Sequence, residues 1–287
     1  MAIVTRAHRP GAKVVRRFRR NGLAVFGLIL VVLFVVLAIA APWLAPYSPK
    51  AISYTAILNA PSGEHLFGTD DLGRDVFSRT VVGARVSLGI GFFSVLIAAV
   101  VGTLVGIVSG YLGGWVDEAM MRIVDAMMAL PFLVLAIVLS AVLGASLQNT
   151  VLAISIVSIP AFARISRGEA VAIKQREFIQ AATALGGRSW RILTRHVLPN
   201  ISGPLIVQAT LSTAQAILTE SSLSFLGLGV QPPTPAWGSM LNTAKGYLET
   251  APWMALYPGG AIFLIVLALS LLGDGLREAF NPRGRAA

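Results

Sequence analysis

Side chains that could carry chemistry are scarce in this 287-residue sequence. It contains no cysteine, which excludes disulfides, thiol chemistry and cysteine metal sites. Its three histidines, His8, His65 and His196, are far apart in the chain. The sequence also lacks the patterns G-x-x-x-x-G-K-[ST], H-E-x-x-H and G-x-S-x-G. Because no nucleophile, base and orienting group can be assembled, we expect no enzyme, no metal site and no cofactor bound by the chain itself.

One carboxylate, Glu220, follows a long uncharged run that begins at Val197. If this run crosses a membrane, an ionisable group there is a candidate functional residue. Two interpretations stay open. In the first, Glu220 lines a translocation path with polar side chains of the same segment, although helical spacing does not let all of them share its face: Gln208, Ser212 and Gln215. In the second, it braces a helix bundle by accepting hydrogen bonds from Thr219, Ser221 or Ser222.

A second candidate site is a basic, helix-prone segment that begins at Glu177. Its apolar side chains follow the spacing i, i+3, i+4, i+7, which predicts one apolar stripe on a short helix: Phe178, Ala181, Ala182 and Leu185. Gly186 and Gly187 then supply the left-handed residue that ends a helix at little cost. The two alanines allow another surface to approach closely.

The same segment predicts a second short helix. Ser189 is a suitable cap, and the apolar residues Trp190, Leu193 and Val197 share a face. We expect Pro199 and Pro204 to end this helix before the next apolar run. Two interpretations of the pair of helices remain: an amphipathic loop that lies on lipid headgroups, or a rigid knob that inserts into a partner subunit.

The elements that position these residues are membrane spans. The chain is 55% hydrophobic and only 13% charged, and several uncharged runs reach the roughly 20 residues that a spanning helix needs. This composition predicts an all-α, polytopic membrane protein. We expect six spans: 22–44, one within 86–116, two on either side of Gly144 within 126–163, 204–226 and 254–273. The first run is longer than the apolar region of a signal peptide.

The distribution of basic residues predicts the topology. Arginine and lysine gather before the first span, between the fourth and fifth spans, and after the last. By the positive-inside rule we expect both termini in the cytoplasm, and we assign the net charge of +10 to topology and not to nucleic-acid binding. The expected divisions are a tail at 1–21, a first span at 22–44, an extracytoplasmic segment at 45–85, a five-span core at 86–273 with a cytoplasmic loop at 164–200, and a tail at 274–287.

An interfacial helix is expected within the 45–85 segment. Thr69 can cap it, with Asp70 and Asp71 in its first turn, and Asp75 and Arg79 have the spacing of an i,i+4 ion pair. It either packs over the bundle or contacts a partner protein.

The stretch QAATALGG…HVLPN is similar to the EAA loop of ABC importer permeases, whose pattern is E-A-A, three residues, Gly, a spacer and I-x-L-P. Five positions match in identity and spacing: Ala181, Ala182, Gly186, Leu198 and Pro199. Gln180 replaces the glutamate, and His196 stands at the isoleucine position. Because the Gln180 amide is neutral, it cannot form a salt bridge of the kind that a glutamate at this position could make.

Three further stretches resemble the dipeptide/oligopeptide/nickel branch of these permeases, and more narrowly its second, C-type subunit. They are RRFRRNGLAVFGLIL (16–30), FGTDDLGRDVFSRTVVGARVSL (67–88) and ESSLSFLGLGVQPPTPAWGSML (220–241). The resemblance implies the type I ABC importer permease fold and makes Glu177 to Gly187 the coupling helix that seats in a cleft of an ATPase.

The resemblance also implies partners in the bacterial plasma membrane: a second homologous permease, two ATPase subunits that bind ATP and Mg, an extracytoplasmic solute-binding protein and membrane lipid. The implied function is import of peptides or a related small solute by alternating access. A secondary carrier or channel without an ATPase is the alternative. It is disfavoured because such carriers often have internal repeats and several buried charges, whereas we find no clear repeat and only Glu220.

Overall fold

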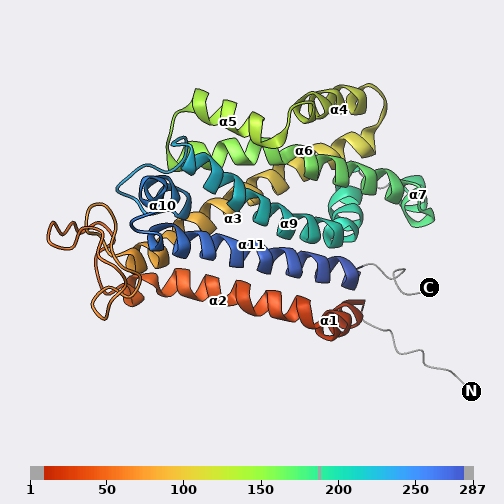
Figure 1. Cartoon of the computed structure of the whole chain (residues 1–287). Coiled ribbons are helices and arrows are strands. Elements are labelled where there is room, and N and C mark those ends of the chain that lie inside the picture. The colour runs from red at the N-terminus through yellow and green to blue at the C-terminus, as the bar shows by residue number, and fades with distance from the viewer. Residues whose placement is uncertain (1–9, 187–188, 281–287) are drawn as a thin grey trace, which may run out of the picture.

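The computed structural model describes residues 10–186 and 189–280, and its regular structure there is helical, as expected (Figure 1). In chain order the helices are α1 (Pro10–Arg20), α2 (Gly22–Leu44), α3 (Val76–Leu112), α4 (Gly114–Met128), α5 (Phe132–Leu143), α6 (Leu147–Lys174), α7 (Glu177–Ala184), α8 (Ser189–Ile192), α9 (Leu198–Phe225), α10 (Trp237–Ala244) and α11 (Trp253–Phe280). A π-helical turn, Leu193–Val197, joins α8 to α9, and a 3₁₀ turn, Lys245–Tyr247, follows α10.

Five helices are long and apolar enough to cross a membrane, and a bent pair passes the same test only when its two helices are taken together. The five are α2, α3, α6, α9 with its π-helical entry, and α11. The pair is α4 and α5, which meet at 90°. The bend lies at Leu130 and Pro131, because proline lacks an N–H and disfavours helical geometry in the residue before it. Five of the six expected spans are therefore present as long helices, and the sixth is present if α4 and α5 cross as one broken span.

The hairpin between the third and fourth spans forms where the sequence predicted it. Gly144, with φ of +86°, ends α5. The Ser146 hydroxyl then accepts a hydrogen bond from the Asn149 N–H at 3.1 Å and caps α6. The Asn149 amide in turn donates to the Leu143 carbonyl at 2.6 Å, so the polar residues satisfy both helix ends.

The expectation of a separate interfacial helix within 45–85 is wrong. Asp75, not Thr69, is the N-cap: its carboxylate accepts from the Ser78 N–H at 2.7 Å. Before it, Gly73 has φ of +71° and turns the chain. Residues 76–85 are the first turns of α3, whose 37 residues give a length of about 55 Å, well beyond the roughly 30 Å hydrocarbon core.

The expectation that Pro199 and Pro204 end a helix is also wrong. Pro199 lies in the first turn of α9, directly after the π-helical turn, and the helix continues through it. Pro204 lies inside α9, which continues to Phe225. The irregularity falls one turn earlier than predicted, in the π-helical turn Leu193–Val197.

A stripe of glycines lets α3 and α6 pack closely. Gly102, Gly106 and Gly110 face the backbone of α6: a Cβ on Gly102 would lie 2.6 Å from the Ile159 carbonyl oxygen, and one on Gly110 would lie 2.7 Å from that of Arg167. Small residues at this spacing are typical of close helix contacts in membranes.

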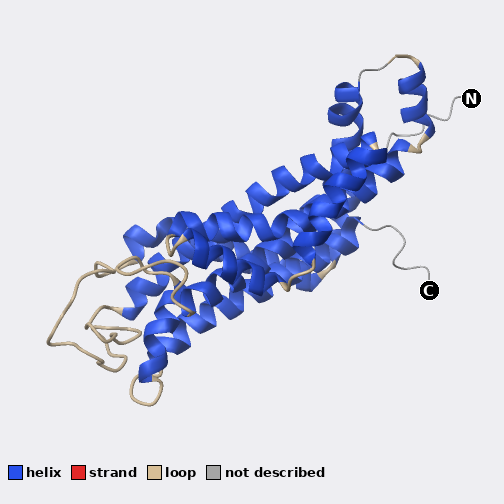
Figure 2. Ribbon diagram, turned by 90° about the horizontal axis from the view of Figure 1, so that it is seen from above, coloured by secondary structure: helices blue, strands red, loops and turns tan. Residues whose placement is uncertain are grey.

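The helices are arranged so that the two candidate regions lie at opposite ends of the bundle. α2 runs beside α11, and α1, α7 and the end of α11 gather at one end (Figure 1). The irregular 45–75 segment and α10 gather at the other (Figure 1), and the view from above shows the long loops gathered at one end of the bundle (Figure 2). Both ends of the described chain therefore lie on the side of the basic loop, as an even number of crossings requires.

Candidate coupling site and pathway face

The first candidate site is α7 with the turn that follows it. The Leu185 N–H donates to the Ala181 carbonyl at 3.0 Å, and Gly186 reverses the chain with φ of +78°. The sequence predicted this helix and its glycine end. Gly187 lies outside the described residues, as does the side chain of Ala182.

Most of the predicted stripe of α7 is exposed. Leu185 is 89% exposed and Phe178 is 44% exposed, and Glu177, Gln180 and Ala181 are exposed as well. What anchors the helix is Ile179, which is 2% exposed and packs in a cluster of buried aliphatic side chains that includes Ile107, Ile173, Ile192 and Val197. The sequence analysis did not identify Ile179 because it lies off the predicted stripe. The available signal was a large aliphatic residue directly beside that stripe. The stripe is thus free to meet another surface.

The second half of the loop returns the chain to the bundle. Ile192 and Val197 are buried, whereas Leu198 and Pro199 are exposed. The Phe178 ring lies 6.2 Å from the His196 ring, so the position that departs from the family pattern packs within the loop.

Gln180, the other departure, faces a groove of about 640 Å³ between α7 and the ends of α3 and α6. Its amide donates to the Gln175 carbonyl at 3.4 Å. This is a weak local contact, so Gln180 adds little to the anchoring of α7.

Ion pairs tie the α6 side of this loop to α4. Arg167 makes two hydrogen bonds to Asp117, at 2.6 and 2.7 Å, and Arg164 contacts Asp125 at 2.6 Å. The Lys174 ammonium also donates to the Tyr111 carbonyl at the end of α3, at 2.7 Å. α6 leads into α7 after only two residues, so these contacts hold the entry to α7. Their members are 39 to 63 residues apart, which is why spacing in the sequence could not reveal them.

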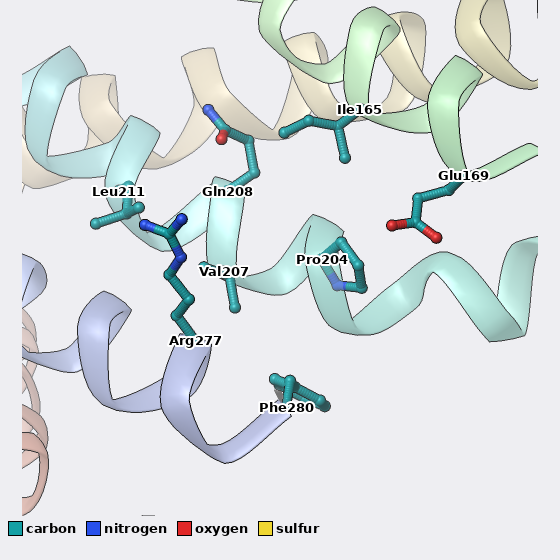
Figure 3. Close-up of a pocket in the computed structure, with 8 residues that line it drawn as sticks. All are labelled: Ile165, Glu169, Pro204, Val207, Gln208, Leu211, Arg277 and Phe280. Carbon is teal, nitrogen blue, oxygen red and sulfur yellow. The ribbon is translucent and has the colours of Figure 1, made fainter. Parts of the chain in front are cut away.

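Three of the four pathway candidates share one face of α9. The Gln208 amide donates to the Ser212 hydroxyl at 2.9 Å, and Gln215 lies exposed one turn further on. Gln208 also borders a cavity of about 580 Å³ between α6, α9 and α11 (Figure 3). Glu169 and Arg277 line the same cavity from α6 and α11. The α9 side chains of this face are polar and uncharged, whereas α6 and α11 each bring one charged residue to the cavity.

Glu220 does not belong to this face. It lies five residues after Gln215, which is about 140° around the helix, and it is fully buried. Its carboxyl accepts from the Ser224 hydroxyl at 2.8 Å and more weakly from Ser221 at 3.4 Å. Ser224 also accepts from the Val230 N–H at 3.2 Å. These contacts support the bracing interpretation, with Ser224 as the main partner that the sequence analysis missed.

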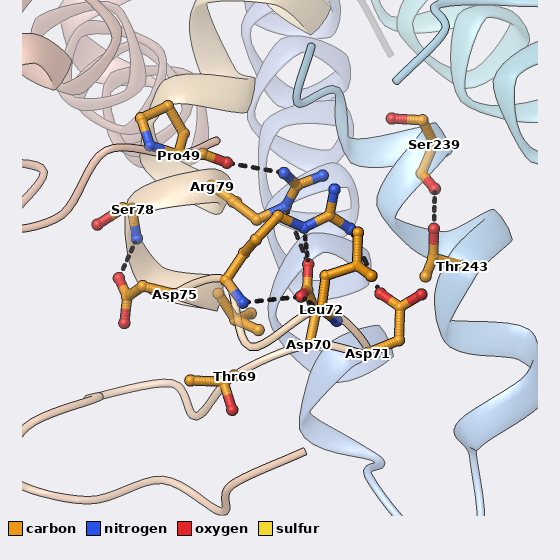
Figure 4. A network of polar contacts seen from close by, with 12 residues as sticks. Pro49, Thr69, Asp70, Asp71, Leu72, Asp75, Ser78, Arg79, Ser239 and Thr243 are labelled. Atoms are coloured by element: carbon orange, nitrogen blue, oxygen red, sulfur yellow. Dashed lines mark hydrogen bonds and ion pairs between the residues drawn. The ribbon is translucent and has the colours of Figure 1, made fainter. Parts of the chain in front are cut away.

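The opposite end of the bundle is held by a buried ionic network (Figure 4). Asp70 contacts Arg74 at 2.7 Å and Arg79 at 3.4 Å, and Arg79 donates to the Pro49 carbonyl at 2.8 Å. The expected pair of Asp75 with Arg79 is wrong: Asp75 contacts His65 at 2.9 Å. Arg79 turns to Asp70 because the Asp75 carboxylate is already used as the cap of α3.

Comparisons with known proteins agree with this architecture. Residues 102–286 match the family described as "Binding-protein-dependent transport system inner membrane component", and residues 9–61 match the N-terminal transmembrane domain of oligopeptide transport permease C. A dipeptide transport system permease protein of Alkalihalophilus pseudofirmus is 46% identical over 96% of this chain and 90% of the relative. A glutathione transport system permease protein of Escherichia coli is 48% identical over 93% of this chain and 89% of the relative.

Among solved structures, the inward-facing MetNI methionine ABC transporter is similar with a TM-score of 0.58. The match covers 71% of this chain and 98% of that one at 19% identity, which supports the fold. Together these matches favour an importer permease over a secondary carrier or channel. The chain therefore belongs to the family of binding-protein-dependent transport system inner membrane components, as a multi-pass, non-catalytic permease subunit of an ABC importer.

Proposed function

We propose that this chain is the C-type half of a peptide importer in the bacterial plasma membrane, with both termini in the cytoplasm. A second homologous permease completes the path, two ATPase subunits bind ATP and Mg, and a solute-binding protein delivers the peptide at the extracytoplasmic end. The names of the dipeptide and glutathione relatives support the peptide class. The basic residues around α1 and the 164–200 loop support the orientation.

The observation that carries the proposal is the exposed stripe of α7. Phe178 and Ala181 on α7, and Leu185 directly after it, lie at the surface of a segment that Ile179 anchors. Apolar side chains presented in this way on a rigid support are typical of a surface that a partner covers. An ATPase cleft is the partner we assign to it.

The two ends of the coupling loop suggest how motion passes through the chain. On one side, α6 is tied to α4 by two ion pairs and to α3 by the glycine stripe. On the other side, the loop joins α9 through the π-helical turn Leu193–Val197, and π-helical turns occur frequently at functional sites. Movement of α7 therefore carries α3, α4 and α6 as one block. The π-helical turn absorbs the displacement of this block relative to α9. The Gln208–Gln215 face of α9 then lines the path, where uncharged polar groups let a peptide pass without tight binding.

The test is Leu185→Asn in the complete transporter. Because Leu185 is 89% exposed, its replacement leaves the fold intact, but it places a polar amide in the contact with the ATPase. We expect peptide uptake to fall about tenfold or more, with a normal amount of the subunit in the membrane. Leu248→Asn, at a 54% exposed leucine of the opposite end, is the matched control for the same surface substitution, and it should keep the ATPase subunits bound. Unchanged uptake by the Leu185 variant would refute the docking role.

A further inference from the structure

A groove of about 840 Å³ runs between α2, α3, α9 and α11, away from the pathway face. Apolar side chains from all four helices line it, among them Val35, Ile39, Leu88, Phe92, Ile206 and Leu269. Thr210 and Thr213 also border it, but their hydroxyls donate to backbone carbonyls of α9. The wall of the groove is thus apolar along most of its length.

One cation interrupts this apolar wall. Arg85 on α3 lines the groove, its side chain is exposed, and among the described residues no carboxylate lies within ion-pair distance of it. Among the α3 residues that line the groove, Arg85 is nearest in sequence to the 45–75 segment. On α2, the lining residues nearest that segment are Pro42 and Trp43. Tryptophan is enriched at the boundary between hydrocarbon and water. The charged end of the groove therefore lies at the membrane boundary, and the rest lies below it.

The length of the groove fits one leaflet. On α2 its lining runs from Val31 to Trp43, a rise of about 18 Å along the helix. One leaflet of the hydrocarbon core is about 15 Å thick. An occupant with one polar end and an apolar body of that length would reach from Arg85 to the middle of the membrane.

We propose that this groove binds an anionic phospholipid of the leaflet next to the 45–75 segment, with its phosphate on Arg85 and an acyl chain along α2. A guanidinium binds phosphate through two charge-assisted hydrogen bonds, and this pairing removes the cost of an uncompensated cation beside hydrocarbon. A helix of the paired permease is the alternative occupant. It is disfavoured because the groove ends in a cation at the membrane boundary, where an anionic lipid supplies both a phosphate for Arg85 and an acyl chain for the apolar wall.

The test uses the purified complete transporter and native mass spectrometry with added phosphatidylglycerol or phosphatidylcholine. We expect phosphatidylglycerol to be retained by the wild type and by Arg85→Lys more than by Arg85→Gln, which should lose about tenfold or more of the bound lipid. Gly89→Leu tests the apolar part, since Gly89 lines the groove and a Cβ there meets no atom within 4 Å. The added side chain should fill the groove and displace the lipid while the subunit folds normally.

Gly260→Leu is the control, because a Cβ on Gly260 also meets no atom within 4 Å and Gly260 lies outside the groove. It should keep both lipid and assembly. Equal retention of phosphatidylglycerol by the wild type, Arg85→Gln and Gly89→Leu would overturn the proposal. The proposal would also be overturned if the wild type bound no lipid and the Gly89→Leu variant released the paired permease. That result would assign the groove to a protein contact.

Discussion

The two ends of the bundle differ in how far their side chains are buried and paired within the chain. At the end with the 45–75 segment, Asp70, Arg74 and Arg79 are nearly inaccessible and their charges are compensated within the chain. At the other end, Ile179 is the buried anchor among the described side chains of α7, and Phe178 and Leu185 are left uncovered. The first region satisfies its charges within the chain, whereas the second presents uncovered apolar side chains, which we assign to a partner. Substitutions should therefore cost stability at the first end and coupling at the second.

The largest expected effect is on stability, at the ionic network. Asp70→Ala leaves the buried Arg74 and Arg79 without their shared carboxylate, and breaking a buried ion pair costs about 3–5 kcal/mol. We expect a clearly lower melting temperature of the purified transporter. Glu118→Ala, which removes an exposed pair with Arg122, should change the stability by less than about 1 kcal/mol. Equal melting temperatures for the two variants would erase the contrast between a buried and an exposed network.

A smaller effect, on coupling, is expected at the tie between α4 and α6. Asp117→Arg places two cations together, and its contact with Ser109 is lost as well. Because this pair is partly exposed, we expect a small loss of stability, but peptide imported per ATP hydrolysed should fall about fivefold or more.

The matched control is the exchanged pair, Asp117→Arg with Arg167→Asp, which restores the attraction and should restore most of the import. If the exchanged pair imports as poorly as Asp117→Arg, the rigid link between α6 and α4 is not what transmits the motion.

The smallest effect is expected at Gln180. Its side chain is exposed and bonded weakly to Gln175, so Gln180→Glu, which restores the family's residue, should change the stability by less than about 0.5 kcal/mol. Peptide uptake should stay within about twofold of the wild type. A large gain in uptake would show that the ATPase recognises the charge at this position. The exposed apolar stripe would then contribute less to the ATPase contact than position 180 does.

Local patterns in the sequence were enough to predict much of the fold. The run of α2 was predicted at its observed bounds, and the Gly144 hairpin and the Gly186 turn follow from residues within a few positions of each other. Elements that depend on distant partners could not be predicted in this way. The cap at Asp75 was misplaced because whether Thr69 or Asp75 begins a helix depends on how the 45–75 segment folds back on α3.

The candidate site also combines features that local sequence predicts with features that depend on distant residues. The stripe of α7 was predictable because a helix has a fixed period, but its anchor Ile179 and the ties of Arg164 and Arg167 are set by tertiary packing. The buried position of Glu220 also required the structure, since spacing alone allowed either a path or a brace.

The most direct test of the central claim is site-specific crosslinking. Because the chain contains no cysteine, Leu185→Cys introduces a unique attachment point for a photoreactive maleimide at a residue that is 89% exposed. In the assembled transporter we predict an adduct with the ATPase subunit from Leu185→Cys, and none from Leu248→Cys at the opposite end. An adduct of Leu185→Cys with lipid alone, or an ATPase adduct from Leu248→Cys, would contradict the account.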